Sequence, residues 1–125
     1  MRRILVVEDS PTSMLLVVYV LENAGHQVFQ AVDAAAGIRI AREALPDLIF
    51  MDIQLPGMDG LEASRLLKAD EATRHIPIYA LTAFAMKGDE ERIRAAGCDG
   101  YLSKPASYKD LLATVEAAGA LGKVQ

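Results

Sequence analysis

The chain has 125 residues and a formal net charge of −4 at pH 7, and 52% of its residues are hydrophobic while 24% are charged. This length suits one domain with one core, and the composition is too apolar for intrinsic disorder. Its thirteen Lys and Arg are interleaved with seventeen Asp and Glu, so no basic stripe favours direct DNA binding. The longest apolar run, residues 14–21, is far shorter than the roughly 20 residues that span a bilayer, so no membrane insertion is expected.

The single cysteine, Cys98, can form no internal disulfide, and neither His nor Cys lies near it to complete a zinc site. This thiol usage favours a reducing compartment, so we expect a cytoplasmic protein with a buried structural thiol. Only four apolar residues separate the charged start of the chain from Glu8, and that stretch is too short for a secretory signal peptide.

The first half of the chain predicts alternating strands and helices. Residues 4–7 form a continuous β-branched and apolar run, which is typical of a parallel strand buried on both faces. Ser10 followed by Pro11 predicts the start of a helix that Gly25 ends. Asp33 predicts the start of the next helix. The expected elements of this half are a strand over 4–7, a helix from 11 to 24, a strand near 27–31, a helix from about 34 to 45 and a strand over 48–51.

Turn residues divide the second half of the chain. Pro56 presets φ, and Gly57 and Gly60 permit positive φ, so residues 55–60 are expected to turn into a helix. Gly97 is expected to end a later helix. The expected elements of this half are a helix over 61–68, a strand from about 78 to 81, a helix from near 88 to 96, a strand over 101–103 and a helix from near 107 to 118.

Five strand-helix units in succession define the expected fold. Crossovers between parallel strands are right-handed, so helices must cover both faces of the sheet. We therefore expect an α/β protein with a flavodoxin-like doubly wound five-stranded parallel sheet, (βα)5, in the strand order 2-1-3-4-5.

Five polar side chains follow directly after, or end, the predicted strands. They are Glu8, Asp9, Asp52, Thr82 and Lys104. Because the carboxyl ends of parallel strands meet at one edge of a sheet, these side chains are expected to lie together where ligands bind. Three carboxylates, a hydroxyl and an ammonium at one place suggest Mg²⁺-dependent phosphoryl chemistry.

Mg²⁺ prefers carboxylate, water and phosphate oxygens in octahedral geometry, and Glu8, Asp9 and Asp52 offer such ligands. Without a cation three packed carboxylates repel one another, so at least one of their pKa values should rise. Asp52 is the candidate nucleophile, while Lys104 and Thr82 would stabilise charge on a phosphoryl group. An alternative for the first two acidic residues is that they merely cap the next helix.

Four groups of residues resemble the signature set of response-regulator receiver domains: Glu8-Asp9, Asp52, Thr82-Ala83 and Lys104-Pro105. Residues 51–60 also resemble the phosphoacceptor segment of that family. The resemblance covers residues 1–125, with about 2–120 expected to be ordered and no output domain expected after the last helix. Residues 75–77, 81–94 and 97–98 resemble single-domain cell-division regulators and the receivers of hybrid sensor kinases.

The resemblance implies a role for each site residue. Asp52 would take a phosphoryl group from a phosphohistidine on a sensor histidine kinase or histidine phosphotransfer protein. Mg²⁺, with Mn²⁺ as a substitute, would be held by Glu8, Asp9, Asp52 and the backbone carbonyl of Gln54. Lys104 would contact the phosphate.

The resemblance also implies a switch that reaches a downstream protein target. Thr82 would move toward the phosphoryl oxygens while Tyr101 turns inward, and the bond between Lys104 and Pro105 is often cis in the family. Phe84, Met86 and Tyr101 are candidates for the output surface. The alternatives are that Tyr101 simply packs and that Phe84 folds into the core.

Three functions remain open from the sequence. The leading one is a stand-alone switch that catalyses only its own phosphorylation and dephosphorylation and is not otherwise an enzyme. The second is the receiver module of a hybrid histidine kinase. The third is a Mg²⁺-dependent phosphohydrolase acting on small phosphate esters, although no second acid-base carboxylate is evident near Asp52.

Overall fold

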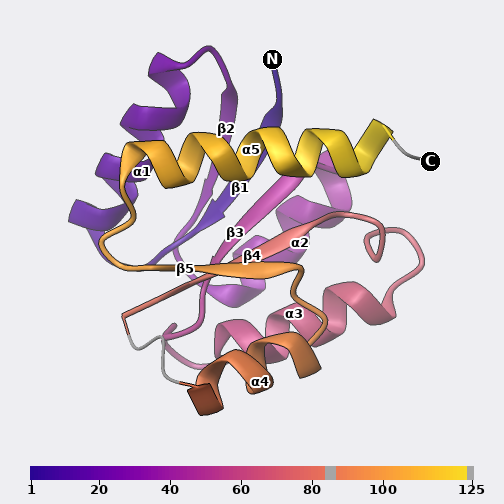
Figure 1. Ribbon diagram of the computed structural model, residues 1–125. Helices are drawn as coiled ribbons and strands as arrows, with labels where there is room; N and C mark the ends of the chain where they lie inside the picture. Colours follow the sequence, from indigo (N-terminus) through magenta and orange to yellow (C-terminus); the bar gives the residue numbers. More distant parts are fainter. Residues whose placement is uncertain (84–86, 124–125) are drawn as a thin grey trace.

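The computed structural model describes residues 1–83 and 87–123. Two candidates for the output surface, Phe84 and Met86, therefore lie outside the described residues. Figure 1 shows the alternation of strands and helices along the chain. In chain order the elements are β1 (Arg3–Val7), α1 (Pro11–Asn23), β2 (Gln27–Ala31), α2 (Ala34–Ala44), β3 (Leu48–Asp52), α3 (Gly60–Ala69), β4 (Ile78–Thr82), α4 (Lys87–Ala95), β5 (Gly100–Ser103) and α5 (Tyr108–Lys123).

The five strands form one parallel sheet in the order β2-β1-β3-β4-β5, so the predicted fold class and strand order are confirmed. The register pairs Asp52 with Leu81 and Thr82 with Ser103. The last residues of β3 and β4 therefore lie at the same edge of the sheet. We call this the carboxyl edge, and the opposite edge, where the strands begin, the amino edge.

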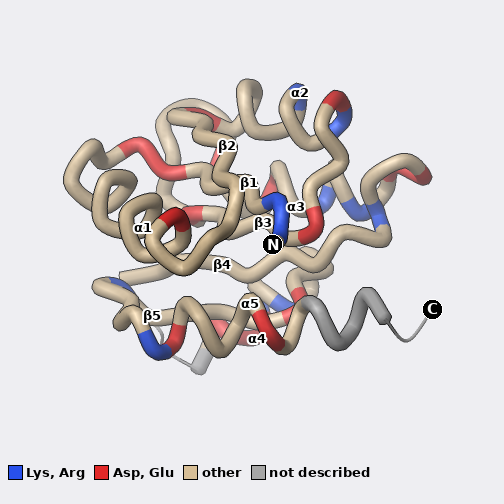
Figure 2. Tube along the Cα trace, turned by 90° about the horizontal axis from the view of Figure 1, so that it is seen from above, with Lys and Arg blue, Asp and Glu red and all other residues tan. Residues whose placement is uncertain are grey.

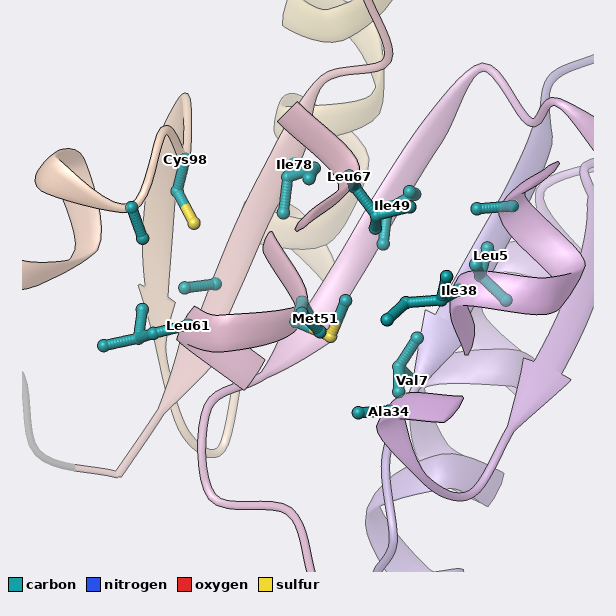
Figure 3. Close-up of a cluster of buried hydrophobic side chains, with 14 of the residues drawn as sticks. Leu5, Val7, Ala34, Ile38, Ile49, Met51, Leu61, Leu67, Ile78 and Cys98 are labelled. Atoms are coloured by element: carbon teal, nitrogen blue, oxygen red, sulfur yellow. The ribbon is translucent and has the colours of Figure 1, made fainter. Parts of the chain in front are cut away.

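Helices cover both faces of the sheet, with α1 and α5 on one face and α2, α3 and α4 on the other (Figure 1). Successive side chains of a strand point to opposite faces, so every residue of a central strand faces a helix layer. On β3, Phe50 packs beneath α1 and α5, while Ile49 and Met51 pack beneath the other layer. Figure 3 shows Met51 in that second cluster together with Leu61 of α3.

Ser10 and Asp33 cap the starts of α1 and α2, as the sequence predicts. The hydroxyl of Ser10 accepts a hydrogen bond from the Ser13 amide at 3.4 Å, and a carboxylate oxygen of Asp33 accepts one from the Ala36 amide at 2.8 Å. The last helix runs beyond its predicted end at Ala118 and includes Gly119 and Gly122, because each glycine costs a helix only about 1 kcal/mol relative to alanine. None of the helices in the described ranges is long and apolar enough to cross a membrane.

The two turn glycines differ from each other. Gly57 has a φ of +76°, as predicted for a residue in the turn. The same prediction is wrong for Gly60, which is the first residue of α3 and has no positive φ. Asp59 caps that helix by accepting a hydrogen bond from the Glu62 amide at 2.8 Å. A close approach between two backbone segments, and not φ, is the reason for a glycine at position 60.

Candidate functional site

The sheet brings the predicted site residues together at its carboxyl edge. Glu8 directly follows β1, Asp52 ends β3, Thr82 ends β4 and Lys104 directly follows β5. The side chains of Glu8 and Asp52 are almost completely buried, with 1% and 2% of their residue surface exposed, whereas Asp9 is exposed. Burial of two carboxylates at one place requires compensation by a cation or by hydrogen bonds.

The three carboxylates form one compact cluster. Glu8, Asp9 and Asp52 each offer an oxygen, and these atoms all lie within 4.8 Å of one another. The backbone of Glu8 is held by its amide, which donates to the carbonyl of Ala31 on β2 at 3.0 Å. Since Ser10 supplies the cap of α1, neither acidic residue is needed for that purpose. Glu8 Oε1 does accept a hydrogen bond from the Ser10 amide at 3.2 Å, so Glu8 contacts the start of α1 in addition to its place in the cluster.

A single ammonium faces this cluster. The Nζ of Lys104 lies 2.8 Å from Glu8 Oε2 and 2.9 Å from Asp52 Oδ2. The Lys104 amide donates to the carbonyl of Thr82 at 2.8 Å, which fixes the start of the following segment against β4. The peptide bond between Lys104 and Pro105 is cis, as the family resemblance implied. One positive charge against three carboxylates leaves the cluster with an excess of negative charge.

Burial and the neighbouring charges together shift the pKa values of Glu8 and Lys104. Burial raises the pKa of Glu8, the charge of Asp52 raises it further, and the hydrogen bond from Lys104 opposes both effects. Burial alone would lower the pKa of Lys104, but its bonds to Glu8 and Asp52 and their charges raise it above its ordinary value. The expectation of a raised carboxylate pKa is thus confirmed, with burial as the larger cause.

The donor set fits a hard divalent cation. Glu8 Oε2 is buried, and the Lys104 ammonium that lies 2.8 Å from it is shared with Asp52, 2.9 Å away. An additional cation would neutralise the remaining charge and use carboxylate oxygens, which are the ligands that Mg²⁺ prefers. The excess of carboxylates in this structure therefore agrees with the metal site that the family resemblance implied.

Backbone hydrogen bonds orient the Asp52 carboxylate. Its Oδ1 accepts from the Gln54 amide at 3.0 Å, while its Oδ2 lies beside Lys104. The next residue, Ile53, donates its amide to the carbonyl of Leu81 at 3.2 Å and accepts from the Gly60 amide at 3.2 Å. The chain after β3 is therefore tied to β4 on one side and to the start of α3 on the other.

Thr82 and Tyr101 lie on neighbouring strands. Thr82 is buried at the end of β4 and lines a cleft of about 280 Å³ together with Gln54 and Arg92. Tyr101 is half-buried against the core, and its hydroxyl donates to Glu90 Oε2 on α4 at 3.5 Å. The structure therefore shows packing of Tyr101 together with a polar contact to α4. A movement of Tyr101 stays a prediction, and nothing in the sequence singled out Glu90 as its partner.

The sequence reasoning missed an apolar surface beside the site. On α1, Leu15 is 72% exposed and Tyr19 is 66% exposed. A groove of about 670 Å³ runs between α1 and α5, where Leu16 and Tyr19 face Tyr108 and Leu112. Figure 2 shows α1 free of basic residues. The signal was present in the sequence, because this helix has more apolar residues than one buried face can hold.

The comparisons with known proteins agree with this geometry. Residues 4–116 match the response regulator receiver domain family. The chain is 46% identical over 115 residues to the polar-differentiation response regulator DivK of Brucella ovis. The match covers 92% of this chain and 94% of that protein. The resemblance to single-domain cell-division regulators is therefore confirmed.

Two solved structures show the same fold. The receiver domain of a sensor histidine kinase from Pseudomonas aeruginosa PAO1, with a magnesium ion coordinated in its active site cleft, has a TM-score of 0.88 and 36% identity and covers 97% of this chain and 98% of its own. The chemotaxis protein CheY4 of Vibrio cholerae has a TM-score of 0.89 and 29% identity, covering 94% of this chain and 98% of its own. The chain belongs to the response regulator receiver domain family, whose members are the phosphoacceptor switches of two-component signalling.

Proposed function

We propose that Asp52 is the phosphoacceptor of this chain and takes its phosphoryl group from a phosphohistidine on a sensor histidine kinase or a histidine phosphotransfer protein. The observation that carries the proposal is the position of Lys104, whose Nζ lies between the buried carboxylates of Glu8 and Asp52. A fixed ammonium beside a buried nucleophile stabilises the charge of an incoming phosphoryl group.

The transfer exchanges one bond to phosphorus for another. A carboxylate oxygen of Asp52 attacks phosphorus, a P–O bond forms, and the P–N bond to the imidazole of the donor breaks. The electron pair of the P–N bond stays with the imidazole, which leaves as a neutral ring when its other nitrogen carries a proton. The product is an acyl phosphate on Asp52, and attack by water restores the carboxylate and releases inorganic phosphate. The chain would thus catalyse only its own phosphorylation and dephosphorylation.

Glu8, Asp9 and Asp52, together with the backbone carbonyl of Gln54, would hold Mg²⁺ or, as a substitute, Mn²⁺. When bound, the cation would neutralise charge on the phosphoryl oxygens. The compact carboxylate cluster, in which one ammonium faces three carboxylates, supports this assignment. Lys104 would contact the phosphoryl oxygens from the side of β5.

Phosphorylation would then change the surface around Thr82 and Tyr101. A new dianionic group at Asp52 attracts hydroxyl and ammonium donors, so Thr82 would turn toward it. Tyr101 would move inward and release its contact with Glu90 on α4. The altered surface of α4 and β5 would bind a downstream protein target, either with the chain acting alone, as its likeness to DivK suggests, or with it acting as a module of a hybrid kinase.

The first test is intact-mass spectrometry after addition of acetyl phosphate, with and without Mg²⁺. We expect the mass of one phosphoryl group to appear in the wild type only with Mg²⁺, and to be absent in Asp52→Asn. The matched control is Asp99→Asn, because Asp99 lies at the amino edge and its side chain makes an ion pair with Lys68.

Each result separates the candidates. A phosphoryl group that still appears on Asp52→Asn would show that another residue accepts it. Absence of a phosphoryl group, with rapid Asp52-dependent loss of acetyl phosphate, would favour the phosphohydrolase. A stable donor and no adduct would exclude phosphorylation of this chain by small phosphodonors.

A further inference from the structure

Gly60, the first residue of α3, lies against the backbone of the proposed phosphoacceptor. A Cβ atom at this position would overlap the carbonyl oxygen of Asp52. It would also lie 2.8 Å from the carbonyl carbon of Asp52 and 2.8 Å from Cα of Ile53. All three atoms belong to the backbone, so no side-chain rotation could make room. The start of α3 and the end of β3 are therefore as close as two backbones can come.

The end of β3 cannot move away to relieve such an overlap. Asp52 is paired with Leu81 in the parallel ladder, and the Ile53 amide donates to the Leu81 carbonyl at 3.2 Å. All residues of β3 are buried between the two helix layers. Displacement of this strand would disturb packing on both faces, which protein interiors tolerate poorly.

The start of α3 is held equally well. Asp59 caps the helix, and the hydroxyl of Ser64 donates to the Gly60 carbonyl at 2.8 Å. Leu61 and Leu67 bury the helix against the sheet, and Figure 3 shows both of them in the core cluster. A side chain at position 60 would therefore strain the segment that connects these two elements, from Ile53 to Asp59.

That segment carries the groups that orient the site. The Gln54 amide donates to Asp52 Oδ1 at 3.0 Å, and the Gly60 amide closes the segment by donating to the Ile53 carbonyl at 3.2 Å. A shift at Ile53 changes the direction of the Gln54 amide and with it the orientation of the Asp52 carboxylate. A carboxylate in the wrong orientation would bind the cation more weakly and attack the phosphoryl donor more slowly.

We propose that Gly60 is a positioning residue: the absence of a side chain at the start of α3 sets the orientation of the Asp52 carboxylate for cation binding and phosphoryl transfer. The proposal rests on the function proposed for Asp52. It predicts that Gly60→Ala impairs the site in molecules that remain folded.

The test compares Gly60→Ala with Gly100→Ala. A Cβ at Gly100 would lie 2.7 Å from the half-buried ring of Tyr79, so this control also introduces a clash, but at the amino edge of the sheet. Calorimetric titration gives the dissociation constant for Mg²⁺, and intact-mass spectrometry gives the phosphorylation rate with acetyl phosphate. The apparent dissociation constant is multiplied by the folded fraction and the observed rate is divided by it, with that fraction measured by circular dichroism under the same conditions.

We expect Gly60→Ala to weaken Mg²⁺ binding and to slow phosphorylation by about tenfold or more, as loss of supporting contacts at metal sites does. Gly100→Ala should stay within about twofold of the wild type on both measures, whatever stability it loses. Folded Gly60→Ala with wild-type Mg²⁺ affinity and rate would overturn the proposal. A wild type that binds Mg²⁺ but gains no phosphoryl group would instead overturn the function proposed for Asp52, and the Mg²⁺ affinities would still decide the role of Gly60.

A second pair of variants covers the case in which Gly60→Ala does not fold. Ser64→Ala removes the bond to the Gly60 carbonyl, and Thr73→Ala removes a similar buried bond to the Leu67 carbonyl near the other end of α3. Only Ser64→Ala should weaken Mg²⁺ binding, by a factor of about 2 to 5. Equal Mg²⁺ affinities in this pair would contradict the proposal.

Discussion

Two lysines at opposite edges of the sheet both make ion pairs with carboxylates, but their surroundings differ. At the carboxyl edge, Lys104 lies beside Glu8 and Asp52. At the amino edge, Lys68 donates to the carbonyls of Arg74 and Ile76 and makes an ion pair with Asp99. Their side chains are similarly buried, with 23% and 20% exposed, so burial does not separate them.

The difference lies in what surrounds each ammonium. Lys68 is matched by one carboxylate and two neutral carbonyls, and Asp99 also accepts from the Ile78 amide at 2.9 Å. Charges there balance, so the group ties α3, β4 and β5 together. Lys104 faces an excess of carboxylates that the described residues leave uncompensated. Balanced charges at the amino edge stabilise the fold, whereas the excess of negative charge at the carboxyl edge favours the cation proposed above.

The largest effect should come from removing the ammonium at the carboxyl edge. We expect Lys104→Met to slow phosphorylation by acetyl phosphate about 10²- to 10³-fold, because a fixed donor to the developing charge is lost. The rate is measured by intact-mass spectrometry at saturating Mg²⁺. Lys68→Met is the matched control and should change the rate per folded molecule by less than about twofold. Equal losses in both variants would remove the functional difference between the two edges.

Mg²⁺ should stabilise the protein through the residues of the carboxyl edge and not through those of the amino edge. Mg²⁺ at about 100 times its dissociation constant is expected to raise the free energy of unfolding by about 2.7 kcal/mol, measured by urea denaturation. Asp9→Asn should lose most of this gain. Without Mg²⁺ the same variant should be more stable than the wild type, because one repelling charge is gone and Asp9 makes no ion pair with the described residues.

The control for that measurement is again at the amino edge. Lys68→Met should gain as much from Mg²⁺ as the wild type does. A wild type whose urea midpoint is the same with and without Mg²⁺ would show that the carboxylates hold no cation under those conditions.

Removing Lys68 should instead reduce stability. Lys68→Met removes the donor to two carbonyls and leaves the Asp99 carboxylate with the Ile78 amide but without its cation, and we expect a loss of about 1–2 kcal/mol in the free energy of unfolding. Arg92→Met is the comparison, since it breaks an exposed ion pair with Asp89 and should cost less than about 0.5 kcal/mol. Similar losses from both variants in urea denaturation would mean that Lys68 is only a surface charge.

The carboxyl edge could be predicted from the sequence because strand ends collect in one place in a parallel sheet. Glu8, Asp52 and Lys104 each stand at such an end, and the caps Ser10 and Asp33 carry their own local signals. These inferences need only the order of residues along the chain.

The rest depends on contacts between segments that are distant in sequence. Lys68 is 31 residues from Asp99, and no local pattern connects them. Gly60 looked like a turn glycine because turn residues surround it, and its approach to the Asp52 backbone appears only when α3 packs on the sheet. The partner of Tyr101, Glu90, belongs to a charged helix in which several residues could have served equally well.

The smallest effects, those of pH, should have opposite signs at the two edges. At the amino edge, His26 Nδ1 accepts from the Arg2 amide at 3.0 Å. Burial, followed by the charges of the N-terminus and Arg2, lowers the pKa of His26 below its ordinary value of 6.5. A lowered pKa means that the stability this group contributes is present above pH 6.5 and is lost as the pH falls through the folded-state pKa.

At the carboxyl edge the sign reverses, because burial raises the pKa of Glu8 above 4.5. Without Mg²⁺ its contribution is present below pH 4.5 and is lost as the pH rises through the folded-state pKa. The stability of the wild type minus that of His26→Gln, measured by urea denaturation, should therefore decrease as the pH falls below 6.5. The corresponding difference for Glu8→Gln should decrease as the pH rises above 4.5. Opposite slopes are expected because burial disfavours the charged form of a base at one edge and of an acid at the other; equal slopes would contradict these two pKa shifts.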